Sequence, residues 1–467
     1  MVFSSLSFIF VFLPALLLVH ALVPKTWRNG LLLLASIIFY LWGEPRFLPL
    51  SLGIVAFAYG SGLLIGRVRS SGVKKVVTAV SVAGILGGLG YFKYFAFLVE
   101  NLNALTGTGF DLARVLLPLG ISFYTFQAVT YVIDIARGDA PVERSPFRLA
   151  LYILLFPKLI IGPIVQYRDI CGQLCTRDVR TEDIVRGLQR FAVGLAKKVL
   201  IATPLGAVAD RVFALPSESL GCGAAWFGAI AYSLQLFYDF GGYSDMALGL
   251  GQMFGFTFKE NFDHPYVSKS ITEFWHRWHI SLGAWFRDYL YIPLGGNRVP
   301  MVRNLINLAI VFLATGIWHG AAWTFIAWGC WHGAFVIFER LTGWSRRNGG
   351  RLLSVSQHIY ALLVIVFGWV LFRADSFTQA RGFWYAMSGC ASSPTPVRSV
   401  WGLTPPEIAA MAAALVCSTP VCSGILRVAQ SSGWRGWLVN AYLLLLFYLS
   451  VVQIVASTYN PFIYFRF

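Results

Sequence analysis

Apolar stretches long enough to cross the hydrocarbon core of a bilayer recur along the whole chain of 467 residues. Each crossing needs about 20 residues in a helix, and polar segments with most of the charge separate the stretches. Only 12% of the residues are charged, roughly half the fraction in a soluble globular protein. The pattern excludes an ordinary cytosolic enzyme, a disordered chain and a disulfide scaffold. It predicts an all-α, polytopic integral membrane protein with a single membrane-embedded domain over residues 1–467.

The apolar stretches differ in continuity. Segment 156–167, FPKLIIGPIVQY, has Lys158 in mid-run, and Gly162–Pro163 interrupts the helix soon after. Broken backbone at membrane depth survives only where protein or a water-filled cavity covers it, so we expect a re-entrant segment beside a cavity. The predicted spans or part-spans are 4–24, 30–43, 47–66, 76–98, 115–133, 149–165, 188–208, 223–256, 304–319, 321–340, 357–373, 405–425 and 437–456.

The net charge of +16 indicates topology, because Lys and Arg gather in cytoplasmic loops beside anionic lipid. Lys25 and Arg28 follow the first span, and a second basic cluster at 67–75 follows the third. An N-terminus outside the cytoplasm puts both clusters inside. Membrane lipids are therefore expected partners. A nucleic acid is not, because the basic residues lack the clustering of a nucleic-acid-binding face.

Five of the seven histidines fall within 264–332, the stretch richest in polar and aromatic residues. We treat 259–333 as the candidate catalytic segment. In FWHRWHISL (274–282), His276 and His279 have the i, i+3 spacing that puts two side chains on one helix face. In TGIWHGAAWTFIAWGCWHG (315–333), His319 and His332 each stand in a Trp–His–Gly step. An imidazole in an apolar segment is costly, which makes it a functional candidate.

His319 is the most informative of these histidines. The apolar run that precedes it starts near Asn304, so the helix reaches only about 24 Å across a core of about 30 Å. Gly316 and Gly320 bracket His319, and a break there would lie inside the membrane. This position suits a general base that is screened from water, whereas the alternative is a histidine that only hydrogen-bonds a neighbouring helix. His332 lies in a more continuous helix and is expected to pack.

The alternatives for the first histidine pair are structural. His279 could be an interfacial histidine, and the tryptophans around His276 could be interfacial anchors. A zinc site built from both histidines and a third ligand is conceivable, although no metal is expected. The chain lacks the G-x-S-x-G elbow of α/β-hydrolases and the P-loop. A soluble-type glycerolipid acyltransferase box is also absent, because no His is followed by Asp five residues later.

An ordered set of motifs resembles the membrane-bound O-acyltransferase superfamily, and within it the branch of alginate O-acetyltransferases. The resemblance covers nearly the whole chain. Its motifs are MVFSS (1–5), RNGLLLLASIIFYLWGEPRF (28–47), PLGISFYTFQ (118–127), FPKLIIGPIVQY (156–167), LFYDFGGYSDMALGLG (236–251), SITEFWHRWHISLGAWFRDYLYIPLGGNR (270–298), TGIWHGAAWTF (315–325) and NPFIYFRF (460–467).

The resemblance implies a ring of tilted helices with re-entrant segments around a central tunnel that has His319 at its neck. His319 corresponds to the essential histidine of the family and His279 to its second active-site position, whereas His276 departs from the basic or amide residue of many relatives. The implied protein resides in the bacterial inner membrane. It passes acetyl from a cytoplasmic thioester to an extracytoplasmic glycan, with an SGNH-type acetyltransferase or other polysaccharide-acetylation proteins as partners.

The expected chemistry is acyl transfer. His319 is the expected base, and protonated His279 orients the reactants or supports the oxyanion. No cofactor is expected to stay bound, and acetyl-CoA or an acyl-carrier protein supplies the acetyl thioester as co-substrate. Alginate is the favoured acceptor; the alternatives are peptidoglycan, cellulose, another exopolysaccharide or teichoic acid, or a lipid or acyl transporter without chemistry. The residues expected to line the tunnel or bind the donor are His276, Arg277, Trp278, Arg287, Asp288, Trp318, Trp323 and Tyr238.

Overall fold

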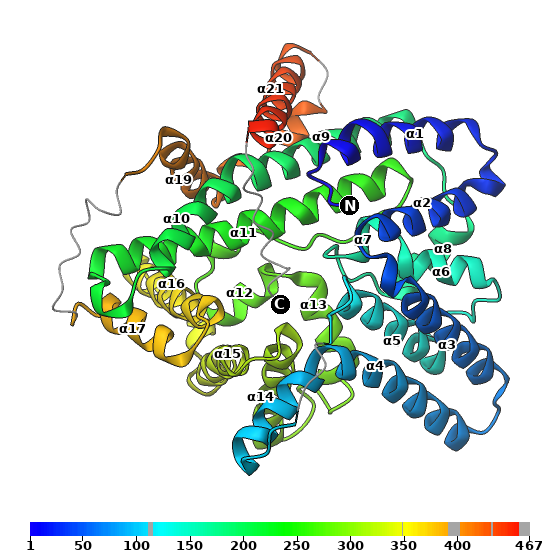
Figure 1. Cartoon of the computed structure of the whole chain (residues 1–467), viewed down its shortest axis with the longest axis horizontal. Helices are drawn as coiled ribbons and strands as arrows, with labels where there is room; N and C mark the ends of the chain where they lie inside the picture. The colour runs from blue at the N-terminus through cyan, green and yellow to red at the C-terminus, as the bar shows by residue number, and fades with distance from the viewer. Residues whose placement is uncertain (111–114, 348, 391–401, 431–432, 457–467) are drawn as a thin grey trace. The chain divides into compact units, whose positions relative to one another are not determined.

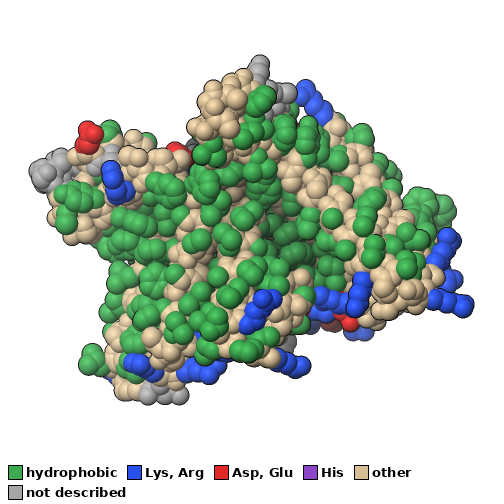
Figure 2. Space-filling model, turned by 90° about the horizontal axis from the view of Figure 1, so that it is seen from below, with side chains coloured by type: hydrophobic (Ala, Val, Ile, Leu, Met, Phe, Trp, Pro, Cys, Tyr) green, Lys and Arg blue, Asp and Glu red, His purple; other side chains and the backbone are tan. Residues whose placement is uncertain are grey.

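The computed structural model describes residues 1–110, 115–347, 349–390, 402–430 and 433–456 (Figure 1). Every regular element in these ranges is a helix, which confirms the predicted all-α class. Apolar side chains cover much of the face seen in Figure 2. A surface of this kind is stable in lipid, where a helix satisfies its own backbone hydrogen bonds.

Six helices are long and apolar enough to cross a membrane, and a bent pair makes a seventh candidate. The bend measures 84° and separates α19 (Pro405–Cys417) from the short helices η9 (Pro420–Cys422) and α20 (Ile425–Ala429). These elements coincide with seven of the predicted stretches and confirm a multi-pass membrane protein. The six are Pro45–Arg67 (η3 and α3), Ser71–Thr106 (α4), Thr181–Phe213 (α9, η4 and α10), Met301–His319 (α14), Arg351–Arg373 (α16) and Trp434–Ala456 (α21).

The other predicted stretches also form helices, but these are shorter or more polar. They are η1 (Phe8–Phe12) with α1 (Leu13–Leu22), α2 (Arg28–Gly43), α5 (Ile121–Arg137), α6 (Pro146–Leu154) with α7 (Phe156–Leu159), α11 (Cys222–Met253) and α15 (Trp323–Thr342). The predicted break in 156–167 is confirmed, because helix ends at Leu159 and resumes in α8 at Tyr167. Lys158 is fully buried there, and its ammonium donates to Gln127 Oε1 and to the Tyr152 carbonyl.

The chain forms two compact units. The first comprises Met1–Leu188 and Met246–Lys259, and the second comprises Gln189–Asp245 and Glu260–Phe467. In the first unit, α3 packs against α4 and α5, and α2 packs against α6. The second unit contains nearly all of the histidine-rich segment, so the site is described within that unit alone.

The hairpin of α14 and α15 is the most closely packed helix pair of the second unit (Figure 1). The two helices meet at Gly316 and Gly329, where neither residue has a side chain. A Cβ atom added to Gly329 would lie 2.5 Å from the Phe312 carbonyl oxygen and 2.9 Å from Gly316 Cα. On its other side α15 packs against α16 and against α12 (Ile271–Arg277). The backbone contact between the glycines therefore fixes the spacing of α14 and α15 close to His319, the last residue of α14.

Candidate active site

The chain bends sharply between His276 and His279. Helix α12 ends at Arg277, Trp278 is extended, and His279 has φ 45° and ψ 53° before α13 (Ile280–Phe286) begins. The prediction that His276 and His279 share one helix face is therefore wrong. Among the described residues, only His264 and His279 combine a side chain with positive φ. Such backbone costs about 1–3 kcal/mol and persists only where the surrounding structure enforces it.

A loop segment around Asn261 enforces this bend. The Ile280 N–H donates to the Asn261 carbonyl, and the Asp263 N–H donates to the Arg277 carbonyl, each over 2.9 Å. These bonds replace the helical hydrogen bonds that would otherwise continue α12 into α13. The break is thus a product of tertiary hydrogen bonding, which overrides the helical pattern of the local sequence.

His279 is held by the side chain of the same asparagine. Asn261 Oδ1 lies 3.2 Å from His279 Nδ1, and it accepts from the Ser281 N–H over 3.2 Å and from the Ser281 hydroxyl over 2.9 Å. A backbone N–H can only donate, so the amide must present its oxygen here. The contact with this oxygen favours the tautomer that has its proton on Nδ1.

The environment of His279 keeps the ring neutral. The residue is 1% exposed and packs edge-to-face against Phe240, with ring centroids 4.6 Å apart. Burial lowers the pKa of the His279 imidazole to about 3, because the charged form would lose its hydration. His279 Nε2 is buried and has no hydrogen-bond partner. The expected oxyanion support by a protonated His279 stays a prediction.

His319 lies at the helix terminus that the sequence predicts. It is the last residue of α14, and Gly320 continues in extended conformation with φ −174°. The ring is 8% exposed and packs edge-to-face against Trp318, Trp328 and Phe372, with centroids 4.8–5.1 Å apart. A break at this position suits a base held inside the protein.

Trp318 joins the two histidines into one cluster. Its ring centroid lies 4.9 Å from that of His319 and 6.1 Å from that of His279. The structure therefore brings together the two residues that the sequence singles out, although 40 positions separate them in the chain. His332 is fully buried against Trp275 and Trp328, as the packing role predicts.

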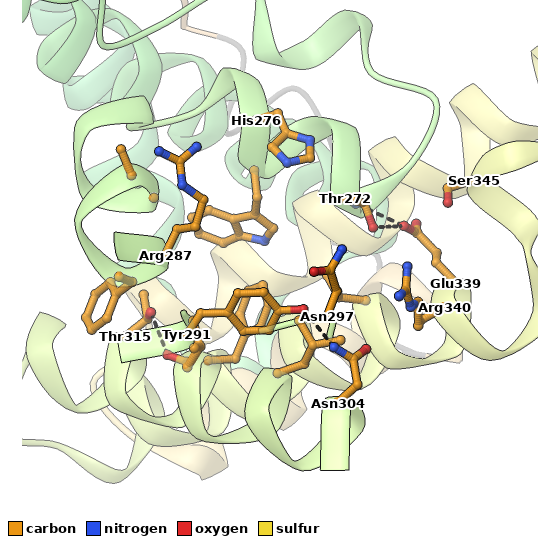
Figure 3. Close-up of a pocket in the computed structure, with 18 of the residues that line it drawn as sticks. Thr272, His276, Arg287, Tyr291, Asn297, Asn304, Thr315, Glu339, Arg340 and Ser345 are labelled. Carbon is orange, nitrogen blue, oxygen red and sulfur yellow. Dashed lines mark hydrogen bonds between the residues drawn. The ribbon is translucent and has the colours of Figure 1, made fainter. Parts of the chain in front are cut away.

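A cavity of about 700 Å³ reaches His279. His276, Arg287, Arg340 and Arg346 also line it, and Figure 3 shows His276 and Arg287 at a distance from Glu339 and Arg340. His319 does not line this cavity. The volume falls within the 300–1,000 Å³ of small-molecule sites, and three guanidinium groups can bind phosphate.

Glu339 anchors the wall of the cavity that carries His276. This carboxylate of α15 is 1% exposed. It accepts from the Ile271 N–H over 2.6 Å and from the Thr272 N–H over 2.9 Å, and the Thr272 hydroxyl also donates to it. An anion at the first turn of a helix satisfies donors that lack intrahelical partners. Glu339 therefore fixes the start of α12 (Figure 3).

The opposite wall depends on Asn304 of α14. Its amide donates to the Tyr291 hydroxyl over 2.7 Å and to the Gly296 carbonyl over 2.9 Å (Figure 3). Gly295 and Gly296 both have positive φ, so residues 295–297 form a tight turn. The cavity consequently lies between the start of α12, which Glu339 caps, and the turn at 295–297, which Asn304 holds by a hydrogen bond.

The remaining candidates are spread around the cluster and do not line the cavity. Trp278 is buried against Phe274 and Trp369, and Trp323 is 54% exposed. Arg277 pairs with Glu273 and Asp263, and the buried Asp288 accepts from Arg287.

Tyr238 belongs to a separate, small cavity that also contains Asn261, Asp245 and Glu260. Its hydroxyl donates to the Ala414 carbonyl over 2.8 Å. Over the described ranges, no group of three His, Cys, Asp or Glu side chains could hold a metal ion. The zinc alternative for His276 and His279 therefore gains no support.

Sequence reasoning missed Asn261 and Glu339. Asn261 gives little signal, because it stands in a polar loop 18 residues before His279. Glu339 gives a clearer one, since an acidic residue near the end of a long apolar stretch is costly unless it is paired. Its partners, 67 and 68 positions away, have no pattern that would identify them.

Comparisons with known proteins agree with one another. The sequence profile of the MBOAT, membrane-bound O-acyltransferase family, matches residues 141–374. The chain is 41% identical over the full length of both proteins to "Probable alginate O-acetylase AlgI" of Pseudomonas putida, and 40% identical, again over the full length of both, to the protein of the same description in Azotobacter vinelandii. It is 35% identical to "Peptidoglycan O-acetyltransferase" of Helicobacter pylori, over 81% of this chain and 78% of that protein.

Proposed function

Because the chain belongs to the membrane-bound O-acyltransferase family, we propose that this acyltransferase moves acetyl from a cytoplasmic thioester through the inner membrane for O-acetylation of an extracytoplasmic polysaccharide. Alginate is the favoured polymer, since the relatives described as alginate O-acetylases match over their full length. Peptidoglycan is the next candidate, supported by the Helicobacter relative. Cellulose, another glycan and teichoic acid are less favoured acceptors.

The cavity that reaches His279 is the observation that carries this proposal. It connects the buried imidazole to Arg287, Arg340 and Arg346. Acetyl-CoA and the phosphopantetheine arm of an acyl-carrier protein both combine a phosphate with a slender thioester chain. Guanidinium groups suit the phosphate, and the apolar inner wall suits the chain. The arginines also support a cytoplasmic opening, because basic residues gather on that side.

The reaction needs one proton to move in a dry site. The acceptor hydroxyl gives its proton to the neutral imidazole of His319, and its oxygen attacks the thioester carbonyl. The C–O bond forms, the C–S bond breaks, and the proton passes from the imidazolium to the departing thiolate. A positioned base of this kind contributes about 10²–10⁴-fold to a rate. The lone pair on His279 Nε2 accepts a hydrogen bond and orients the reacting groups.

An extracytoplasmic SGNH-type acetyltransferase, or another polysaccharide-acetylation protein, would receive the acetyl group before the glycan does. In that arrangement the membrane protein supplies passage and activation, and its partner supplies glycan specificity. Acyl transfer to a hydroxyl of the partner uses the same proton path, so the proposal covers both acceptors.

The test compares His319→Ala and wild type at equal abundance in the membrane of an alginate-producing host that lacks the native enzyme. The measurement is glycan-bound acetyl released by mild base. We expect a loss of at least 100-fold, as for removal of a general base. His358→Gln is the matched control, because His358 lies on α16 with Nδ1 against the Ser268 carbonyl, outside the cavity. Acetylation at the wild-type level in His319→Ala would refute the assignment.

A further inference from the structure

Two features of position 279 remain to be explained together: a strained backbone and a ring nitrogen without a partner. His279 adopts the left-handed conformation, and its Nε2 is buried and unpartnered. The combination of strained backbone and unpartnered nitrogen indicates that the ring is held in one orientation because the site uses it.

Asn261 contacts position 279 in two independent ways. Its backbone carbonyl accepts from Ile280 N–H, which fixes the bend, and its side-chain oxygen lies beside His279 Nδ1, which fixes the ring. The Ser281 N–H and hydroxyl orient that oxygen. Asn261 Nδ2 makes no hydrogen bond, so the amide acts here only as an acceptor.

The geometry points to Asn261 as a positioning residue that holds His279 in its Nδ1–H tautomer, so that Nε2 presents a lone pair to the thioester chemistry in the cavity. This inference rests on the proposed function and deepens it. It assigns His279 as a proton acceptor or hydrogen-bond acceptor, in place of the expected oxyanion donor. The tautomer decides between these roles, because a neutral imidazole donates from one nitrogen only.

The side chains packed directly against the His279 ring are uncharged. Phe240 of α11, Phe262 of the loop before α12, and Trp318 of α14 pack against it, and Ser281 of α13 completes the contact. The titratable and charged groups on the shared cavity wall are His276, Arg287, Tyr291, Glu339, Arg340 and Arg346. The small cavity beside Asn261 adds Lys197, Tyr238, Asp245, Glu260, His264 and Cys417. A charge introduced at position 261 would lie in hydrogen-bond reach of Nδ1 and should therefore act strongly on the ring.

Asn261→Asp is the informative variant. A carboxylate accepts the same hydrogen bonds from His279 and Ser281, and the amide nitrogen that it replaces has no bond to lose. The new anion favours the imidazolium form and raises the pKa of His279. Activity that needs a bare Nε2 is then lost as the pH falls through that raised pKa. We expect near-wild-type kcat at high pH and an acidic limb shifted upward by at least one pH unit.

Asn261→Ala removes the acceptor altogether and should lower kcat by up to about 100-fold, as misplacement of a reacting group by about 1 Å does, with little change in the KM for acetyl-CoA. Asn440→Asp serves as the control for the chemical change, because Asn440 of α21 bonds Ala429 and Gln189 instead. If Asn261→Ala fails to accumulate, the pH profile of Asn261→Asp decides alone. Equal loss in both variants without a shift of the acidic limb, or wild-type kcat in Asn261→Ala, would overturn the inference.

A second readout does not depend on catalysis. In protein labelled with ¹⁵N-histidine, the His279 signals are assigned by their loss in His279→Gln, and the chemical shifts report which nitrogen is protonated. We expect Nδ1 protonated and Nε2 bare in the wild type. A protonated Nε2 overturns the inference even in an active enzyme. Wild-type membranes without acetyl transfer would instead refute the proposed function, and the ¹⁵N spectrum would still test the tautomer.

Discussion

Gly329→Ala should slow the enzyme without unfolding it. The added Cβ would lie 2.5 Å from the Phe312 carbonyl oxygen, whereas ordinary contact begins at 3.4 Å. The Phe312 oxygen and Gly316 Cα, which lie nearest to the added Cβ, are both backbone atoms, so no side chain can rotate away. Helices α14 and α15 must separate by the difference, about 0.9 Å. Overpacking of this size costs about 1–3 kcal/mol, which a multi-pass protein of this size tolerates.

The separation reaches His319, because Phe312 lies about two turns before it on the same helix. A misplacement of about 1 Å at a reacting group can cost about 100-fold in rate. We therefore expect kcat near 1% of wild type, with protein abundance little changed. Gly87→Ala on α4 is the matched control, since nothing lies within 4 Å of its added Cβ.

The assay measures acetyl transfer from acetyl-CoA in membranes that contain equal amounts of each variant, with size-exclusion profiles in detergent as the check on folding. The prediction concerns kcat, because His319 ends the displaced helix; the KM should change less, since neither Gly316 nor Gly329 lines the cavity, although Phe312 does. A Gly329→Ala variant that folds and keeps the wild-type kcat would refute the reasoning that helix spacing sets the position of His319.

Glu339→Gln replaces one acceptor oxygen with an amide group that faces the N–H groups of α12. We expect the free energy of unfolding to fall by about 1–3 kcal/mol. Thermal unfolding in detergent should show a lower midpoint, and an unchanged midpoint would contradict the prediction. Arg340→Gln should raise the KM for acetyl-CoA and leave kcat unchanged. The difference in KM from wild type should shrink at high salt, because added ions screen the charge. Steady-state kinetics at two salt concentrations test this, and a fall in kcat alone would argue against a donor-binding role for Arg340. Cys417 Sγ and Cys422 Sγ lie 3.1 Å apart, so a short bifunctional alkylating agent should bridge them; mass spectrometry should find the bridged peptide in wild type and lose it in Cys417→Ser, and two separately modified thiols would speak against this geometry.

Length and hydropathy were sufficient to predict the membrane-spanning helices, because the bilayer imposes both. The helix end at His319 was predictable for a similar local reason, since Gly320 follows an apolar run that is already short for a crossing. These features depend on residues adjacent in sequence. The same holds for the break after Leu159, where Gly162 and Pro163 mark the interruption.

The conformation at His279 could not be predicted in this way. The sequence WHRWHI continues a helical pattern, and nothing in it stops the helix. The bend arises from hydrogen bonds to Asn261, 18 positions earlier, and a tertiary contact leaves no period in the sequence. Glu339 was missed for the same reason, because its partners stand at the start of a helix nearly 70 residues away.

The left-handed backbone at position 279 also limits which amino acids can occupy it. Asn, Asp and His tolerate this conformation better than other residues with side chains, and β-branched residues are excluded by steric clash. Asn and Asp are also polar, as a partner for the Asn261 amide must be. Variation at this position during evolution should therefore alternate among His, Asn and Asp. The backbone conformation at position 279 would thus restrict which side chains can serve in the site, independently of the reaction.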